Sequence, residues 1–449
     1  MILSTSSQPQ GLIKRLLTRF NRVERWLLWV CLVGVLGSGS GLAYQYRLNT
    51  TTLVPASGGA YREGIVATSL ADVTPTISVL TKIGLTRLND GGEFEAGTAT
   101  TWQVSDDGKT YTFALAPSVD RDVIRTVLEQ RHDLFPDSTV TVSNEGAVTV
   151  VLKQPFSPFL ATTATPLFPY GPFQIMTQDK GIVRLKPNPH SLVGQPLLQE
   201  IVLRMYPDTF NLTQALASGE IDGVSDTTAI STQRLLGGLQ TYQILLPRTL
   251  YLFFNTERVV VATADRRRAL SSGTPVDGAP EIHLVTLANP KHEQLAQDIV
   301  KRWTALGVRV VVETHTATEL ATEIVPKRAY DALIYGLDFG GDPDPYPFWH
   351  SSQIGPSGLN LSNFANIDAD RILEKARQTH AVKDRTDLYT QFRTIIADQV
   401  PAIELEQVQA TFGVDAKLRG VRSHPGLTVA DRYSFVTDWY RKTRRVTKP

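Results

Sequence analysis

The sequence predicts an α/β protein with two folded lobes that follow one N-terminal membrane-spanning segment. The chain has 449 residues, more than one hydrophobic core usually serves, and its 42% apolar and 20% charged residues are typical of a globular protein. Strand and helix patterns alternate between residues 281 and 335, as they do in α/β sheets. Residues 26–43 form the most apolar stretch of the chain.

Charge is distributed unevenly along the chain. Residues 1–25 carry a net charge of +4 and residues 441–449 carry +5, although the total is only +1, so residues 26–440 are left with −8. An acidic body argues against a nucleic-acid-binding protein, whose folded domain presents a basic face. The basic N-terminal segment and the basic C-terminal tail are therefore expected to be membrane-surface or solvated segments.

The apolar stretch from Trp26 to Ala43 has 18 residues and would reach ~27 Å as a helix, close to the ~30 Å hydrocarbon core of a bilayer. Its positive flank comes first, which predicts a cytoplasmic N-terminus and an extracytoplasmic body held at the cell membrane by a single pass. A cleaved signal peptide, with Gly41 and Ala43 at the cleavage positions, stays open as an alternative. Cys31 is the only cysteine, so the chain has neither an internal disulfide nor a thiolate metal cluster.

The first lobe begins after a polar stretch, residues 44–60, which we expect to be a flexible linker. Strand signals dominate from residue 61 to about 155, for example from Tyr111 to Leu115 and from Ala147 to Leu152. Frequent prolines between 155 and 200 indicate extended connections. A helix that Asp208 or Thr209 caps and Gly219 ends comes next, and a strand from Thr249 to Asn255 follows it.

The second lobe has the alternating pattern of strands and helices. The helix from Lys291 to Leu306 presents Leu295, Ile299 and Trp303 on one face, and the strand after it reads as one buried on both sides of a parallel sheet. Two more amphipathic helices follow, at about 368–379 and 383–398. The expected elements of the alternating stretch are Glu281 to Leu287, Lys291 to Leu306, Val308 to Glu313, Ala317 to Ile324 and Ala329 to Tyr335.

Between Thr256 and Pro280 the sequence changes from a pattern rich in strands to an alternation of strands and helices. We expect the boundary between the lobes to lie there. We expect the first lobe to comprise residues 61–256 with a return segment at about 410–440, and the second lobe to comprise residues 257–409. Ligands prefer domain interfaces and the carboxyl ends of strands in open α/β sheets, so a site between the lobes is expected.

Known motifs for nucleotide or zinc chemistry are missing from the sequence. It has no G-x-G-x-x-G after a strand, no G-x-x-x-x-G-K-[ST], no H-E-x-x-H, no G-x-S-x-G and no C-x-x-C. We therefore expect no cofactor and no resident metal, and these motifs give no evidence for catalysis.

The most unusual segment is residues 335–353, where Asp338, Asp342 and Asp344 lie among glycines, prolines and aromatic residues after a buried strand. Carboxylates with aromatic walls can bind a ligand ammonium group by charge and by ring stacking. Two other interpretations stay open. The aspartates could cap turns while the aromatic side chains pack, or they could bind a metal together with His350.

Five separate segments resemble the extracytoplasmic solute-binding proteins of family 5, the peptide and nickel type. They occur in family order between about residues 60 and 440, and together they are more specific than any one of them. The segments are ATTWQVSDDGKTYTFAL at 99–115, YGPF at 170–173, IVLRMYPDTFNLTQALASGEIDG at 201–223, YLFFNTERVVVATADRRRAL at 251–270 and DPDPYPFWHSSQIGPSGLNLSNF at 342–364.

The resemblance implies a periplasmic-binding-protein-like fold of type II, the dipeptide- and oligopeptide-binding kind, whose two lobes close on a ligand. It also implies the substrate-binding role in an ABC importer, with a permease and ATPase subunits as partners and a peptide or similar solute as the ligand. The chain is a shortened member, since it lacks family residues within 114–132 and between Leu270 and Glu281. These losses leave the identity of the ligand open.

The resemblance also implies a set of ligand-binding residues. The aspartate that pairs with a peptide α-amino group in peptide-binding members matches Asp338 here. The whole expected set lines a cleft between the lobes and comprises Tyr251, Phe253, Asn255, Tyr335, Asp338, Asp342, Asp344 and Trp349. Two other functions stay open: a membrane-anchored sensor or scaffold without transport, and an anchored hydrolase that uses Asp342, His350 and Ser351.

Overall fold

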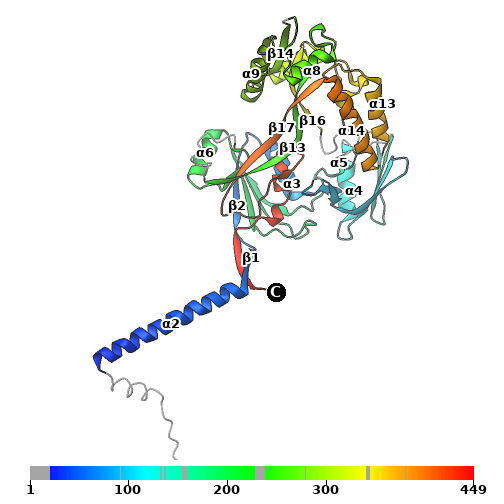
Figure 1. Ribbon diagram of the computed structural model, residues 1–449. Helices are drawn as coiled ribbons and strands as arrows, with labels where there is room; N and C mark the ends of the chain where they lie inside the picture. The colour runs from blue at the N-terminus through cyan, green and yellow to red at the C-terminus, as the bar shows by residue number, and fades with distance from the viewer. Residues whose placement is uncertain are drawn as a thin grey trace, which may run out of the picture. The chain divides into compact units, whose positions relative to one another are not determined.

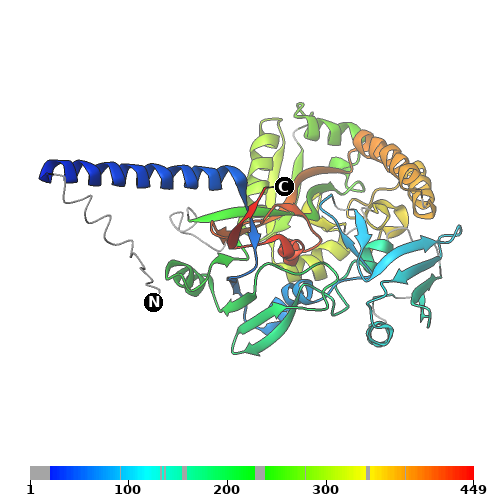
Figure 2. The same cartoon turned by 90° about the horizontal axis from the view of Figure 1, so that it is seen from below.

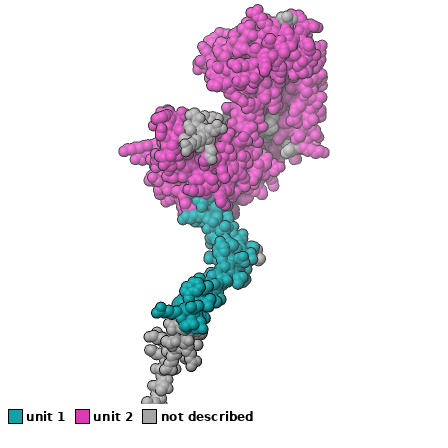
Figure 3. Space-filling model, turned by 60° about the vertical axis from the view of Figure 1, so that its left-hand side comes forward, with its two compact units in different colours: residues 1–57, 440–449 teal, residues 58–439 magenta. Residues whose placement is uncertain are grey.

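The computed structural model describes residues 21–448 except 92, 132–133, 136–137, 154–158, 228–237, 279, 340–343 and 380. The chain divides into two compact units, one of residues 1–57 with 440–449 and one of residues 58–439 (Figures 1 and 3). Each unit is described by itself.

The first unit contains one long helix, α2 (Arg22–Thr50), which is long and apolar enough to cross a membrane. Asn21 caps it by accepting the amide hydrogens of Val23 and Glu24, and the Glu24 side chain accepts the amide hydrogen of Asn21 in return. This capping box explains why the helix begins before the predicted stretch 26–43. The helix continues to Thr50 because no proline interrupts it.

A two-stranded ribbon completes the first unit. Strand β1 (Thr51–Ala56) pairs antiparallel with β19 (Lys442–Thr447), and Thr51 lies opposite Thr447. The flexible linker expected at 44–60 and the free basic tail expected at 441–449 are therefore corrected, since most of both segments belongs to this ribbon and α2. Threonine and valine favour strands, but their pairing partner lies almost the whole chain away in sequence.

The second unit is built on one sheet of 11 strands among the described residues. Ten of them follow the order β15-β14-β16-β13-β17-β12-β2-β11-β10-β9, and β18 pairs with β13. In the first lobe β11, β2 and β12 are parallel neighbours, with helices α3 and α6 following β2 and β11. The bounds of these elements are β2 (Ala60–Val66), α3 (Leu70–Thr81), β9 (Phe173–Asp179), β10 (Ile182–Pro187), β11 (Glu200–Tyr206), α6 (Thr209–Ala217), β12 (Gly223–Val224) and β18 (His424–Pro425).

A β-rich subdomain is inserted into the first lobe, as the strand signals before residue 155 predicted. Its four-stranded sheet has the order β5-β6-β8-β7 and a core of its own around Tyr111, Phe113 and Phe159. A hairpin of β3 and β4 precedes this four-stranded sheet in the sequence. The bounds are β3 (Thr86–Leu88), β4 (Phe94–Ala96), β5 (Ala99–Val104), β6 (Thr110–Leu115), α4 (Arg121–Gln130), β7 (Ser138–Val142), β8 (Ala147–Leu152) and α5 (Phe159–Thr163).

The second lobe has the alternating order that the sequence predicted. Strand β14 has the predicted bounds and lies between β15 and β16, parallel to both. The expectation that β15 is buried on both sides is wrong, because β15 lies at the edge of the sheet and none of its residues is fully buried. The bounds are α8 (Ala264–Ser272), β14 (Glu281–Leu287), α9 (Pro290–Thr304), β15 (Arg309–His315), β16 (Ala332–Asp338), α12 (Tyr346–Trp349), α13 (Ile367–Gln378) and α14 (Val382–Gln399).

Two long antiparallel strands, β13 (Leu239–Phe254) and β17 (Ala402–Asp415), run through both lobes (Figures 1 and 2). Their register shifts between Leu245 and Thr249, where β13 contains Pro247. The chain therefore crosses between the lobes inside β13 and not at the boundary expected after residue 256. Figure 3 shows the corresponding indentation between the two masses of this unit.

Candidate functional site

The predicted ligand-binding residues converge on β13 and β16, at the end of the second lobe that adjoins the crossing strands. The two strands are antiparallel, with Arg248 opposite Asp338 and Tyr251 opposite Tyr335. Side chains alternate along a strand, so the first pair lies on one face of the sheet and the second pair on the other. The fourth predicted member of this group, Asp342, lies outside the described residues.

Asp338 ends β16 and keeps an accessible carboxylate. Its Oδ2 lies 2.9 Å from Nη2 of Arg248, and the two side chains are 48% and 51% exposed. An ion pair this exposed contributes little to stability. A ligand ammonium group would meet a carboxylate that already has a cationic neighbour.

Tyr251 and Tyr335 form the aromatic part of the site and are both partly buried. The Tyr251 ring centroid lies 6.2 Å from that of Trp349 and 6.3 Å from that of Phe339. Burial, and then the charge of Glu404, raise the pKa of Tyr251 to about 12. The phenol is therefore a neutral hydrogen-bond donor at ordinary pH, beside a wall of aromatic rings.

Four predicted residues lie in the interior of the second lobe, where they present no surface to a ligand in this structure. Phe253 and Asn255 are 0% and 2% exposed, and Trp349 is 4% exposed. The Asn255 amide nitrogen donates to the carbonyl oxygens of Arg328 and Tyr330, both at 3.2 Å. These contacts support the loops of the lobe.

Asp344 is the fourth buried residue, and it has the role of a turn and ion-pair residue. Its carboxylate accepts the amide hydrogen of Tyr346 at 3.1 Å and lies 2.7 Å from Nη2 of Arg377. The Arg377 guanidinium also stacks over the Tyr346 ring, 3.8 Å from its centroid. The turn-capping interpretation therefore describes Asp344 better than ligand binding does.

Sequence reasoning missed four charged residues near the crossing. Arg248 pairs with Asp338, and β17 places Glu404 opposite Tyr251 and Glu406 opposite Leu250. Lys291 at the start of α9 forms an ion pair with Glu406 at 2.5 Å. The alternation Glu404-Leu405-Glu406 was the available signal for a strand with one charged face.

A second feature that the sequence did not predict is a cavity of about 390 Å³ in the first lobe. It lies between α3, the β3–β4 hairpin and the segment 424–435, and every lining residue belongs to the first lobe. Its walls are mostly apolar and include the side chains of Lys82, Arg87, His424 and Asp431. Such a lining suits non-covalent binding of a small amphipathic molecule.

His424 is a buried polar residue of that cavity. It is 6% exposed, and Nδ1 lies 2.7 Å from the carbonyl oxygen of Pro425, so Nδ1 carries the hydrogen. Burial lowers the pKa of His424. The ring packs edge-on against Phe435 with 4.7 Å between the centroids.

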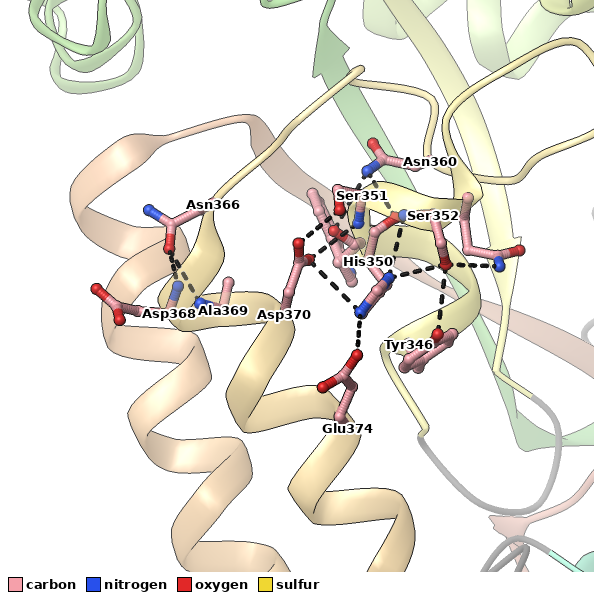
Figure 4. Close-up of polar contacts among 12 residues, drawn as sticks. Tyr346, His350, Ser351, Ser352, Asn360, Asn366, Asp368, Ala369, Asp370 and Glu374 are labelled. Carbon is pink, nitrogen blue, oxygen red and sulfur yellow. Dashed lines mark hydrogen bonds and ion pairs between the residues drawn. The ribbon is translucent and has the colours of Figure 1, made fainter. Parts of the chain in front are cut away.

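The polar contacts around His350 test the hydrolase and metal interpretations (Figure 4). Ser351 Oγ donates to Asp370 Oδ2 at 2.5 Å, and the Ser351 amide donates to Oδ1 at 2.9 Å. His350 Nδ1 accepts the amide hydrogen of Ser352 at 3.1 Å, while Nε2 lies 3.4 Å from Glu374 Oε1. The hydroxyl of Ser351 is thus bound to a carboxylate of α13 and not to His350.

His350 and Ser351 are therefore not paired as a base and its nucleophile, and Asp342, the third residue of the hydrolase interpretation, lies outside the described residues. The contacts instead fasten the segment after α12 to α13, since Ser351 is bonded across to Asp370 and His350 is stacked on Tyr346. Among the residues that the structure describes, no group of three or more His, Cys, Asp or Glu side chains has the arrangement of a metal site.

Comparisons with known proteins agree with this fold. Residues 130–279 match the model of the bacterial extracellular solute-binding proteins, family 5 Middle. The probable D,D-dipeptide-binding periplasmic protein DdpA of Escherichia coli is 23% identical over 436 residues, which cover 75% of this chain and 83% of that protein. Protein XP55 of Streptomyces lividans is 22% identical over 394 residues, which cover 66% of this chain and 73% of that protein.

Among solved structures, the ABC transporter substrate-binding protein CtaP of Listeria monocytogenes superposes with a TM-score of 0.70. The match covers 86% of this chain and 99% of that one at 17% identity. The predicted two-lobed α/β fold of the type II binding proteins is confirmed by this likeness.

Proposed function

We propose that the chain is a bacterial extracellular solute-binding protein of family 5 and the substrate-binding component of an ABC importer. It captures a peptide or a similar small solute between its two lobes and delivers it to a permease that ATPase subunits power. It is not an enzyme. The dipeptide-binding relative supports a peptide as the substrate. The solvent-exposed charges of Arg248 and Asp338 at the crossing support a ligand with charged ends.

The observation that carries the proposal is the construction of the crossing. In the described part of the chain, two strands of one continuous sheet, β13 and β17, pass between the lobes there. Their register shifts at Pro247, where the ladder of hydrogen bonds is interrupted. A short interruption in two adjacent antiparallel strands is a suitable hinge, because few residues have to absorb the change in backbone angles. Closure about this point would bring a ligand at Asp338 against the first lobe.

The helix α2 supplies the second part of the proposal, an uncleaved anchor in the cell membrane. Its 29 residues correspond to a length of about 43 Å, enough to cross a hydrocarbon core of ~30 Å and both interfaces. The basic residues before Trp26 place the N-terminus in the cytoplasm. The binding lobes are then extracytoplasmic and stay close to the permease.

Native mass spectrometry of the full chain, extracted from the producing cell in mild detergent, tests this function. We expect an additional mass that dissociates on activation and fragments as a peptide. The intact mass shows at the same time whether residues 1–43 are retained. A protein that comes out empty and also ignores a library of short peptides would overturn peptide import and favour a sensor or scaffold on the same fold.

A further inference from the structure

The first unit has a one-sided charge that solute capture does not explain. Residues 25–57 and 440–449 contain no aspartate or glutamate and seven basic residues. Five of the seven are in the C-terminal segment that contributes β19: Arg441, Lys442, Arg444, Arg445 and Lys448. The strand pairing fixes where these cations lie.

The register of the ribbon sorts its cations onto two faces. Lys442 lies opposite Ala56 and Arg444 opposite Val54, so these two cations share a face with Thr52 and Val446. Arg445 lies on the other face, where its Nη1 donates to Thr51 Oγ1 at 3.1 Å. One face therefore combines two cations with small apolar side chains, and the other carries a single cation that is already bonded to a hydroxyl.

The ribbon starts where the apolar helix ends. Strand β1 begins at Thr51, directly after α2, and the Lys448 amide donates to the Thr50 carbonyl at 2.8 Å. The ribbon then turns away from the helix axis and does not prolong it (Figures 1 and 2). If α2 crosses a bilayer, its last two turns after Ala43 reach the headgroups, and the ribbon runs along the surface of the membrane.

The ribbon also needs support from outside itself. In the described chain β1 and β19 form a sheet of two strands only, and such a pair is marginally stable alone in water. Basic side chains on exposed strands can serve simply to prevent edge-to-edge aggregation. That role would require cations but would not require the complete absence of acidic residues on both segments.

We propose that the β1–β19 ribbon is a membrane-surface stalk that binds anionic lipid headgroups through the face of Lys442 and Arg444, with Lys448 beside the end of the helix. The inference rests on the proposed anchoring by α2 and goes beyond solute capture. Cations this close to an anionic surface each add binding energy, and three of them change the association roughly 100-fold.

The full chain reconstituted in nanodiscs provides the test. With Cys31 replaced (C31S), a fluorescent label is attached at T52C on the proposed lipid face or at T443C on the opposite face. The nanodiscs contain phosphatidylcholine alone or an equal mixture with phosphatidylglycerol. Quenching by acrylamide is measured, because a neutral quencher is not itself attracted or repelled by surface charge.

We expect the label at T52C to be shielded several-fold in the anionic nanodiscs only, and the label at T443C to be quenched equally in both. The triple change K442Q/R444Q/K448Q should abolish the shielding, whereas R445Q, the matched change on the other face, should preserve it. Equal quenching of the T52C label in the two kinds of nanodisc would overturn the proposal. Shielding that survives the triple change would overturn it as well.

The native cysteine separates failure of the ribbon from failure of the anchor. Cys31 lies in the apolar part of α2, so in the unmodified protein a charged maleimide should not reach it in either nanodisc. Labelled Cys31 would show that α2 is not inserted and would overturn both ideas. Protected Cys31 together with lipid-independent quenching at T52C would overturn the stalk alone.

Discussion

Glu63 and Arg432 form an ion pair closed off from solvent, although they are 369 residues apart in the sequence. Arg432 Nε donates to Glu63 Oε1 at 3.0 Å and Nη2 donates to Oε2 at 2.5 Å, and the two side chains are 0% and 2% exposed. Glu63 lies on β2, and Arg432 lies in the short helix Val429–Tyr433 of the C-terminal segment. The pair therefore ties the end of the second unit back to its first strand.

Removing one partner of this pair should destabilise the first lobe strongly. R432M leaves the Glu63 carboxylate buried without its cation, a change that costs about 3–5 kcal/mol, whereas E63M/R432M should recover most of this loss. Denaturant unfolding followed by tryptophan fluorescence measures the effect, with Trp439 in the same core as a local reporter. A single variant within about 0.5 kcal/mol of the unmodified protein would mean that water reaches the pair.

Replacing Asp338 should weaken the binding of ligands with a free amino group. D338N removes the charge that an ammonium would meet, and we expect a loss of about 1–3 kcal/mol, the cost of a hydrogen-bonded charge left without its partner. Calorimetric titration with a short peptide and with its N-acetylated form measures this. The acetylated peptide, which has no ammonium, should bind both proteins alike.

R248Q is the matched control, because it removes the other half of the same ion pair. It frees the Asp338 carboxylate from its cation, so the affinity for the free peptide should be unchanged or higher. If R248Q weakens binding as much as D338N does, the pair acts as a structural unit and Asp338 is not the ammonium contact. Unchanged affinity in D338N would also remove that assignment.

Much of the fold was predictable because its signals are local. Strands β8 and β14 have the predicted bounds, and α13 and α14 begin and end within a residue or so of theirs. Alternating and helical apolar patterns, caps and glycines operate over a few residues. Pairing across the whole chain has no such signal, which is why the β1–β19 ribbon was missed.

The candidate site was predictable only in part. A loop of aspartates after a buried strand identified Asp338, but the same composition also describes Asp344, which bonds inside the lobe with Arg377. Exposure and face decide between these roles, and both follow from tertiary packing. Arg248 and Glu404 were missed because they come from strands whose position opposite Asp338 and Tyr251 only the sheet register establishes.

Stability of the first lobe should fall as the pH drops below the ordinary value of the histidine pKa. Burial lowers the pKa of His424 from 6.5, so below that pH the unfolded chain binds a proton that the folded chain resists, and unfolding becomes more favourable. The contribution of neutral His424 to the free energy of unfolding is therefore fully present above pH 6.5, and it is lost as the pH falls below this value. Melting temperatures of the unmodified protein and H424Q at pH 7.5 and pH 5.5 measure it.

The comparison with H424Q isolates this residue because the other histidines are common to both proteins. His283, for example, has a raised pKa through its hydrogen bond to Glu313, which gives the opposite dependence on pH. We expect the melting temperature of H424Q to change less between the two pH values than that of the unmodified protein. Parallel changes in both proteins would show that His424 is not protected from protons in solution.

The bond between Ser351 and Asp370 should stabilise the second lobe without any role in hydrolysis. Ser351 donates to both carboxylate oxygens of Asp370, through its hydroxyl and its amide. S351A and D370N should each cost about 1–2 kcal/mol in denaturant unfolding, since a hydrogen bond to a charged group contributes about 1.5–3 kcal/mol. The double variant S351A/D370N should lose less stability than the sum of the losses in the two single variants, because both single variants break the same contact.

Hydrolysis of peptide substrates is measured on the same proteins. We expect no turnover above background in the unmodified protein, S351A or H350A, because the Ser351 hydroxyl is directed to Asp370 and away from the histidine. Turnover that the unmodified protein shows and H350A loses would contradict the assignment of these residues to structure. Additive losses in the double variant would instead contradict the direct bond, and would place Ser351 and Asp370 in separate supporting contacts.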